Sequence, residues 1–136
     1  MLHDFGAMQD NHDRFVRRVV EAETVWGLNI GSGLASCPSH DEQAGEVIMF
    51  WSDRAYAERA RQRSCPESRV DSLPLFEFLF RWLPGMADDG LMAGPNWTSD
   101  LAGLEVDPME LHEQILDALP LHVIGRLRKR LQQGLS

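Results

Sequence analysis

Apolar residues recur at helical spacing near the amino terminus and with a period of two directly after it. The first pattern predicts an amphipathic helix over residues 13–22, because residues three and four apart share one helix face. The second predicts a strand over residues 24–30, then a turn at 31–33 and a returning hairpin strand at 34–37. We expect the polar residues 1–10 to be flexible. The apolar positions are Phe15, Val16, Val19 and Val20 in the helix and Trp26, Leu28 and Ile30 in the strand.

Residues 47–51 have no polar partner face, which is typical of a central strand that is covered on both sides. Ser52 and Asp53 follow directly, and their side-chain oxygens can accept hydrogen bonds from the free amides of a helix. We therefore expect them to cap a helix over residues 53–63. A helix cap also explains both residues without any catalytic role.

Two short strands and an apolar helix follow in the middle of the chain. Residues 69–72 predict the first strand, and residues 73–83 predict the helix, which a Pro-Gly pair is expected to stop. An Asp-Asp-Gly turn then leads into a second strand over residues 91–94.

The sharpest local signal is Asp107-Pro108-Met109-Glu110, with an N-cap carboxylate, proline at the first helical position and glutamate at the third. It predicts a helix over residues 108–119, which Pro120 breaks. Residues 121–136 predict a basic amphipathic helix. This helix either docks on its own domain or packs against another chain, and self-docking is favoured because it loses less translational entropy.

Together these elements predict a single α+β domain over residues 1–136, with a small, mainly antiparallel sheet packed with several helices. Hydrophobic residues make up 43% of the chain, enough for a core without disulfides or metal. The net charge of −8 argues against nucleic-acid binding, which depends on neutralising phosphates.

Neither a membrane span nor a secretory signal is predicted from this sequence. No apolar run approaches the roughly 20 residues that a spanning helix needs, and the amino terminus lacks a basic segment followed by an apolar one. We therefore expect a cytoplasmic protein without a membrane partner, in which Cys37 and Cys65 are reduced thiols.

Several short segments stand in a recognisable order along the chain. They are Val25-Trp26-Gly27-Leu28, Phe50-Trp51-Ser52-Asp53 with Tyr56-Ala57, residues 78–83, Asp89-Gly90 with Gly94 and Asn96-Trp97, and residues 103–108. This ordered set resembles the bacterial family known as domain of unknown function 2750. The resemblance covers about residues 13–120 and leaves out the basic carboxyl-terminal helix. It implies a compact α+β protein, bacterial and cytoplasmic, and it transfers no catalytic residue.

Candidate catalytic and metal-binding residues are few. Cys37 and His40 have a metal-ligand spacing, with Asp41, Glu42 and Cys65 as conceivable further ligands, but no second close pair completes a zinc site. No nucleophile motif surrounds either cysteine. No glycine-rich loop opens a helix, as a nucleotide site requires. We therefore predict no catalytic residue, no metal and no cofactor.

Two hypotheses remain for the function. The favoured one is a non-catalytic protein that acts through protein–protein contact, as a monomer or homodimer. Trp97, in a polar loop, is the tryptophan expected to be most exposed, and it serves either as an interface anchor or, by preference, in loop packing.

The alternative is a small-ligand binder or enzyme whose pocket lies at the carboxyl end of the predicted strand 47–51. Arginines on the following helix either attract an anionic ligand or acidic partner, or pair locally with acidic neighbours such as Glu58. These arginines are Arg54, Arg59, Arg61 and Arg63. The candidate site residues for a ligand or partner are Trp51, Arg54, Tyr56, Asn96 and Trp97.

Overall fold

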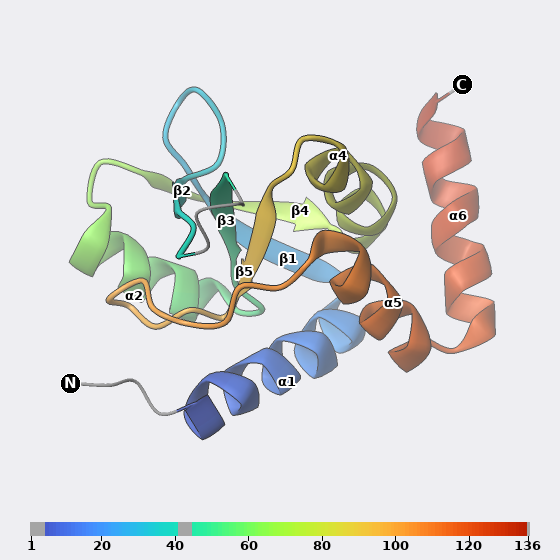
Figure 1. The fold of residues 1–136 in the computed structure, drawn as a ribbon. Helices are drawn as coiled ribbons and strands as arrows, with labels where there is room; N and C mark the ends of the chain where they lie inside the picture. The colour runs from blue at the N-terminus through green and yellow to red at the C-terminus, as the bar shows by residue number, and fades with distance from the viewer. Residues whose placement is uncertain (1–4, 41–44, 136) are drawn as a thin grey trace.

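A computed structural model describes residues 5–40 and 45–135 of the chain. The fold is α+β, as predicted, with short strands at the centre and helices around them (Figure 1). The elements are α1 (Phe5–Ala22), β1 (Thr24–Asn29), β2 (Ser36–Pro38), β3 (Glu46–Phe50), α2 (Arg54–Ser64), β4 (Arg69–Pro74), α3 (Leu75–Glu77), η1 (Phe78–Trp82), α4 (Leu83–Asp88), β5 (Met92–Pro95), α5 (Pro108–Ala118) and α6 (Leu121–Leu135).

The described strands form two small sheets that are joined at one point. β1 pairs with β4 in antiparallel fashion, and β3 lies between an antiparallel β2 and a parallel β5. The sheets meet where Trp26 and Trp51 exchange two backbone hydrogen bonds of 2.8 Å. The mainly antiparallel pairing is confirmed, but the expected single sheet is divided. β5 can run parallel to β3 because α2, β4 and the helical segment from α3 to α4 lie between them in the sequence.

The predicted hairpin after β1 forms only at its closed end. Asn29 and Leu34 make a single bridge, and the Ala35 amide donates to the Leu28 carbonyl over 2.7 Å. Beyond this point β2 pairs with β3, while β4 lies along the full length of β1. The turn after β1 was therefore predicted correctly. The main partner of β1 was not, because β4 is distant from it in sequence and local turn signals do not reveal it.

α1 begins earlier than predicted, so residues 5–10, which were expected to be flexible, form the first turns of this helix; residues 1–4 lie outside the described part of the chain. The half-buried Met8 and the buried His12 extend the stripe of Phe15 and Val19 towards the amino terminus at the same helical spacing. His12 Nε2 lies 2.7 Å from Gln114 Oε1 on α5, which ties this first part of α1 to the domain.

The Pro-Gly pair at 84–85 does not end the apolar helix, as had been predicted. Helical structure continues from Leu75 to Asp88 through η1, a π-helical segment after which the Leu83 amide donates to the Phe78 carbonyl. The widened turn relieves the clash between a proline ring and the preceding turn, and Pro84 has no N–H to leave unpaired. The helix also starts two residues late, because Leu73 and Pro74 belong to β4.

Hydrophobic side chains gather in two clusters on opposite sides of β3. Phe50 points into the larger cluster, which α1, the α3–α4 segment and α5 cover, whereas Trp51 points into the smaller cluster under α2. In Figure 1, α2 lies to one side of the strands and α4, α5 and α6 lie to the other. The central strand is therefore covered on both faces, as its apolar sequence predicted.

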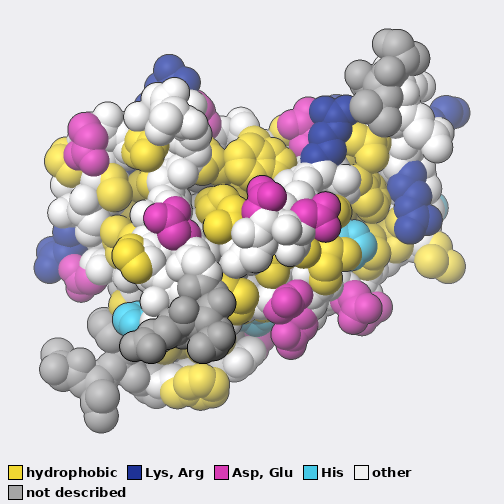
Figure 2. Space-filling model, turned by 45° about the horizontal axis from the view of Figure 1, so that its top comes forward, with side chains coloured by type: hydrophobic (Ala, Val, Ile, Leu, Met, Phe, Trp, Pro, Cys, Tyr) yellow, Lys and Arg dark blue, Asp and Glu magenta, His cyan; other side chains and the backbone are white. Residues whose placement is uncertain are grey.

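α6 packs on its own chain in the structure, while its packing against a second chain stays an untested alternative. Leu127 is 1% exposed and belongs to the larger hydrophobic cluster. Arg126 forms an ion pair with Glu23, and the guanidinium groups of Arg128 and Arg130 lie over aromatic rings of η1 and α3. Lys and Arg side chains gather on α6, at the right of Figure 2, while acidic side chains spread over the body.

The described helices include none that is both long and apolar enough to cross a lipid bilayer.

The docking of α6 predicts that Leu127→Ala destabilises the domain by about 2–4 kcal/mol, since it leaves a cavity in the core. Leu121→Ala is the matched control on the same helix, because Leu121 is 85% exposed. We expect it to change the free energy of unfolding by less than about 0.5 kcal/mol. Urea unfolding measures both, and equal effects would show that α6 does not pack on the domain in solution.

Candidate functional site

A pocket of about 430 Å³ opens where β3 and β5 end side by side. Its floor is formed by buried residues that directly follow the two strands: Trp51 after β3, and Asn96 and Trp97 after β5. α1 forms one wall and α2 another, and the loop after β5 closes the rim. The remaining lining residues are Asn11 and Arg14 from α1, Tyr56 and Arg59 from α2, and Thr98 and Ser99 from the loop.

The structure brings four of the five predicted site residues together at this pocket: Trp51, Tyr56, Asn96 and Trp97. Arg54, the charged group proposed for the site, does not line it. The Arg54 guanidinium lies instead 5.7 Å from the ring centroid of the half-buried Trp26 on β1.

Two of the α2 arginines form ion pairs with acidic side chains, and one lines the pocket. Arg61 binds Glu58 at 2.7 Å, as the local explanation predicted, and Arg63 pairs with Asp100. Arg59 alone among the four lines the pocket, where its guanidinium lies 5.5 Å from the Tyr56 ring centroid.

Sequence reasoning missed the contribution of α1. Asn11 and Arg14 lie one helical turn apart on the pocket side of α1, and Arg14 Nη1 donates to Asn11 Oδ1 over 3.0 Å. The signal that could have found Asn11 is the apolar stripe through Met8 and His12, which places the start of the helix before residue 11. Nothing local to Asn11 or Arg14 shows that they face the ends of β3 and β5.

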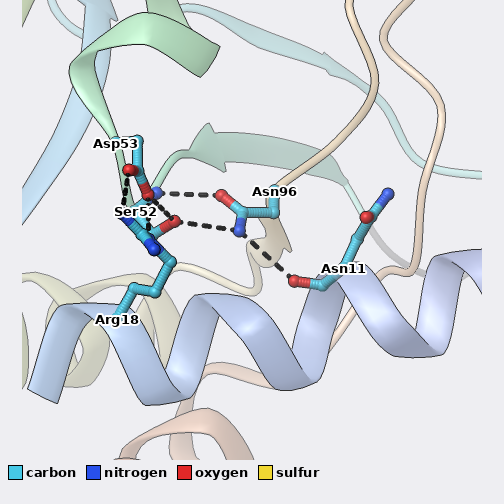
Figure 3. A network of polar contacts seen from close by, with 5 residues as sticks. All are labelled: Asn11, Arg18, Ser52, Asp53 and Asn96. Atoms are coloured by element: carbon cyan, nitrogen blue, oxygen red, sulfur yellow. Dashed lines mark hydrogen bonds and ion pairs between the residues drawn. The ribbon is translucent and has the colours of Figure 1, made fainter.

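The Asn96 side chain fixes the pocket floor through a buried polar network (Figure 3). Its Oδ1 accepts from the Ser52 amide at 2.8 Å, and its Nδ2 donates to Ser52 Oγ at 3.0 Å and to the Asn11 carbonyl at 3.3 Å. The backbone of Asn96 is left-handed, with φ of 49°, a conformation that asparagine adopts more readily than most residues. One side chain thus links β3, β5 and α1.

Asp53 occupies the N-cap position of α2, but its side chain makes no capping hydrogen bond, contrary to the prediction. The carboxylate instead accepts two hydrogen bonds from Arg18, at 2.7 and 2.6 Å, and one from Ser52 Oγ at 2.7 Å. A bidentate, charge-assisted pair is stronger than a bond to a backbone amide. Burial acts to raise the pKa of Asp53, but the bonds from Arg18 and Ser52 outweigh it and hold the pKa below its ordinary value.

Trp97 is 5% exposed, so the expectation that it is the most exposed tryptophan is wrong and the preferred packing role is correct. Its ring fills the space above Gly94 and Gly103, where any Cβ atom would collide with it. Trp97 Nε1 donates to the Leu104 carbonyl at 2.7 Å, and its own carbonyl accepts from Trp51 Nε1 at 2.9 Å. Trp26 and Trp82, which had been expected in the core, are only half-buried.

Neither cysteine lies in an environment that activates a thiol as a nucleophile. Burial, with Cys65 and Glu46 adding to it, raises the pKa of Cys37, and burial likewise raises the pKa of Cys65, whereas activated thiols have lowered values. The described residues contain no group of three potential metal ligands. Asp41 and Glu42, two of the conceivable ligands, lie outside the described part of the chain.

The side chains that line the pocket are mostly polar. The pocket offers two guanidinium groups, the Tyr56 phenol and the side-chain amides and hydroxyls of its polar residues. The described residues that line it include no Asp, Glu, His, Cys or Lys, the side chains that most often act as acids, bases or nucleophiles.

The close fit of Trp97 predicts that Gly103→Ala destabilises the domain by about 1–3 kcal/mol, because the new methyl group must displace the ring. Gly85→Ala is the control, since no neighbouring atom lies within 4 Å of the added Cβ. It should be neutral, or stabilising by up to about 1 kcal/mol in the helix. Urea unfolding and tryptophan emission test both variants, and a Gly103→Ala protein as stable as Gly85→Ala would contradict the fit.

The lowered pKa of Asp53 predicts how stability depends on pH. The ionised carboxylate contributes fully above its unfolded-state pKa of about 4, and that contribution is lost as the pH falls below this value. Asp53→Asn should therefore reduce stability at pH 7 and weaken the loss of stability on acidification. Urea unfolding from pH 7 to pH 3 measures this, with the exposed Asp117→Asn of α5 as control. Identical pH profiles for the two variants would refute the role of Asp53.

Comparison with known proteins agrees with the resemblance seen in the sequence. A family model described as "Protein of unknown function (DUF2750)" matches residues 12–115, which run from α1 into α5 and include every pocket-lining residue except Asn11. α6 lies outside the match. No curated protein and no solved structure matches the chain at a significant level. Because the match extends over well more than half of the sequence, the chain belongs to this family of proteins of unknown function.

Proposed function

We propose that this protein binds a small ligand, without transforming it, in the pocket at the ends of β3 and β5. The observation that carries the proposal is the convergence of polar side chains from three separate segments, α1, α2 and the loop after β5, on one pocket of about 430 Å³. This volume lies within the range of small-molecule sites in proteins. Ligands of α/β proteins also often bind beyond the carboxyl ends of parallel strands, where loops and helix starts leave room.

The rigidity of the floor supports binding further. Asn96 is held by hydrogen bonds to three other groups, and Trp97 is held between two glycines. Binding groups that are already fixed lose less conformational entropy when a ligand arrives. A pocket with a fixed floor and longer, more exposed side chains on its walls suits recognition of a particular small molecule.

The hypothesis of protein–protein contact has less support than the sequence suggested. It relied in part on Trp97 as an exposed anchor, and Trp97 is buried. The large hydrophobic side chains that are exposed in the described part of the chain are Phe5, Ile30, Met109 and Leu121. They come from α1, the turn after β1, α5 and α6, and do not mark one interface. A protein partner and the oligomeric state stay predictions.

A screen of small polar fragments by ¹⁵N nuclear magnetic resonance tests the proposal. We expect ligands to shift the backbone amides of Thr98 and Ser99 and the indole N–H of Trp97, because these groups surround the pocket. Shifts confined to α6, or no reproducible shifts, would contradict it.

Two variants provide matched controls for the screen. Ser99→Phe places a bulky ring at the pocket rim and should abolish the shifts. Ser32→Phe makes the same change in the exposed turn after β1 and should leave them intact. Equal binding to both variants would place the ligand elsewhere.

A further inference from the structure

Two arginines line the pocket from two different walls, and neither forms an ion pair among the described residues. Arg14 comes from α1 and Arg59 from α2. The described ion pairs engage five other arginines: Arg18, Arg61, Arg63, Arg69 and Arg126. The printed contacts of Arg14 and Arg59 are to an amide oxygen and to an aromatic ring.

These contacts orient the two guanidinium groups without neutralising them. Asn11 Oδ1 accepts from Arg14 Nη1, and the face of Tyr56 supports Arg59 through a cation–π contact. Both arrangements leave further N–H donors of each guanidinium available to another acceptor, since arginine carries five.

The nearby carboxylate of Asp53 does not cancel this charge. Arg14 is close enough to contribute to the lowered pKa of Asp53, but burial and the bonds from Arg18 and Ser52 are the larger influences on it. Arg18 occupies both carboxylate oxygens. The pocket therefore carries two positive charges and no lining carboxylate, in a chain whose net charge is −8.

We propose that the ligand of this pocket is a small organic dianion, a phosphate monoester, whose phosphate group binds between Arg14 and Arg59. The inference rests on the proposed ligand-binding function and specifies the chemistry of the ligand. A phosphate monoester carries close to two negative charges at neutral pH and three acceptor oxygens, which match two guanidinium groups. The pocket is larger than a phosphate group, so the organic part lies against Tyr56 and the floor.

Phenyl phosphate is the probe, and phenyl sulfate and benzyl alcohol are its monoanionic and neutral counterparts. We expect phenyl phosphate to shift the Thr98 and Ser99 amides and to bind more tightly than either. Its affinity should rise as the pH increases from about 5 to 7, because the second ionisation of the phosphate has a pKa near 6. The affinity should also fall with added salt.

Arg14→Gln and Arg59→Gln should each weaken binding of phenyl phosphate roughly 10- to 100-fold, the range for hydrogen bonds to charged groups. Arg17→Gln on α1 and Arg63→Gln on α2 are the controls, since both arginines lie outside the pocket lining, and they should bind normally. If a glutamine variant fails to fold, the lysine variant at the same position replaces it. The lysine variant keeps the charge and should retain part of the affinity.

The outcomes separate the two proposals. If benzyl alcohol or other neutral fragments bind the pocket as well as phenyl phosphate, and the glutamine variants bind normally, the dianion proposal is wrong while ligand binding stands. Equal binding of phenyl sulfate and phenyl phosphate, with no pH dependence, also overturns the dianion. If no fragment shifts the pocket amides, both proposals fail.

Discussion

The carboxyl end of β3 is the point on which the rest of this structure depends. Within two residues, Trp51 pairs its backbone with Trp26 and donates its indole N–H to the Trp97 carbonyl, and the Ser52 amide donates to Asn96. These bonds join the two sheets to each other and to the loop after β5. Buried polar groups need partners, since each unpaired one costs about 1–3 kcal/mol. The hydrogen bonds of Trp51 and Ser52 therefore restrict how the two sheets and the loop can be placed relative to one another.

The pocket is a consequence of this junction. Two parallel strands end side by side and their chains separate, one into α2 and the other into the loop that Trp97 holds down. Trp51 and Trp97 pack in the smaller hydrophobic cluster and also form part of the pocket floor. These two residues therefore belong both to the core and to the pocket, whereas Arg14 and Arg59 on the walls are not part of the core.

The sequence predicted elements well and pairings poorly. Asp107 and Asp53 show why, because each is an aspartate directly before a helix and each was expected to cap it. Asp107 accepts from the Met109 and Glu110 amides as predicted, at 2.9 and 3.3 Å. Asp53 binds Arg18 instead, which lies 35 residues away on α1 and is invisible to local reasoning. The candidate site was predictable where it follows β3 and β5, since strand ends are local features, and not where α1 completes it.

The position of α1 also explains why its arginines differ in role. Arg18 and Arg14 lie one turn apart on the same helix, and Asp53 can satisfy only one of them with both oxygens. The pair with Arg18 fixes α1 against the start of α2 and leaves Arg14 without a carboxylate partner among the described residues, at the pocket that Arg59 also lines. The proposed dianion would contact both arginines in the folded state alone, because only folding brings α1 and α2 to one pocket. A ligand that binds as proposed should therefore also stabilise the contact between α1 and α2, because whatever binds only the native state shifts the folding equilibrium towards it.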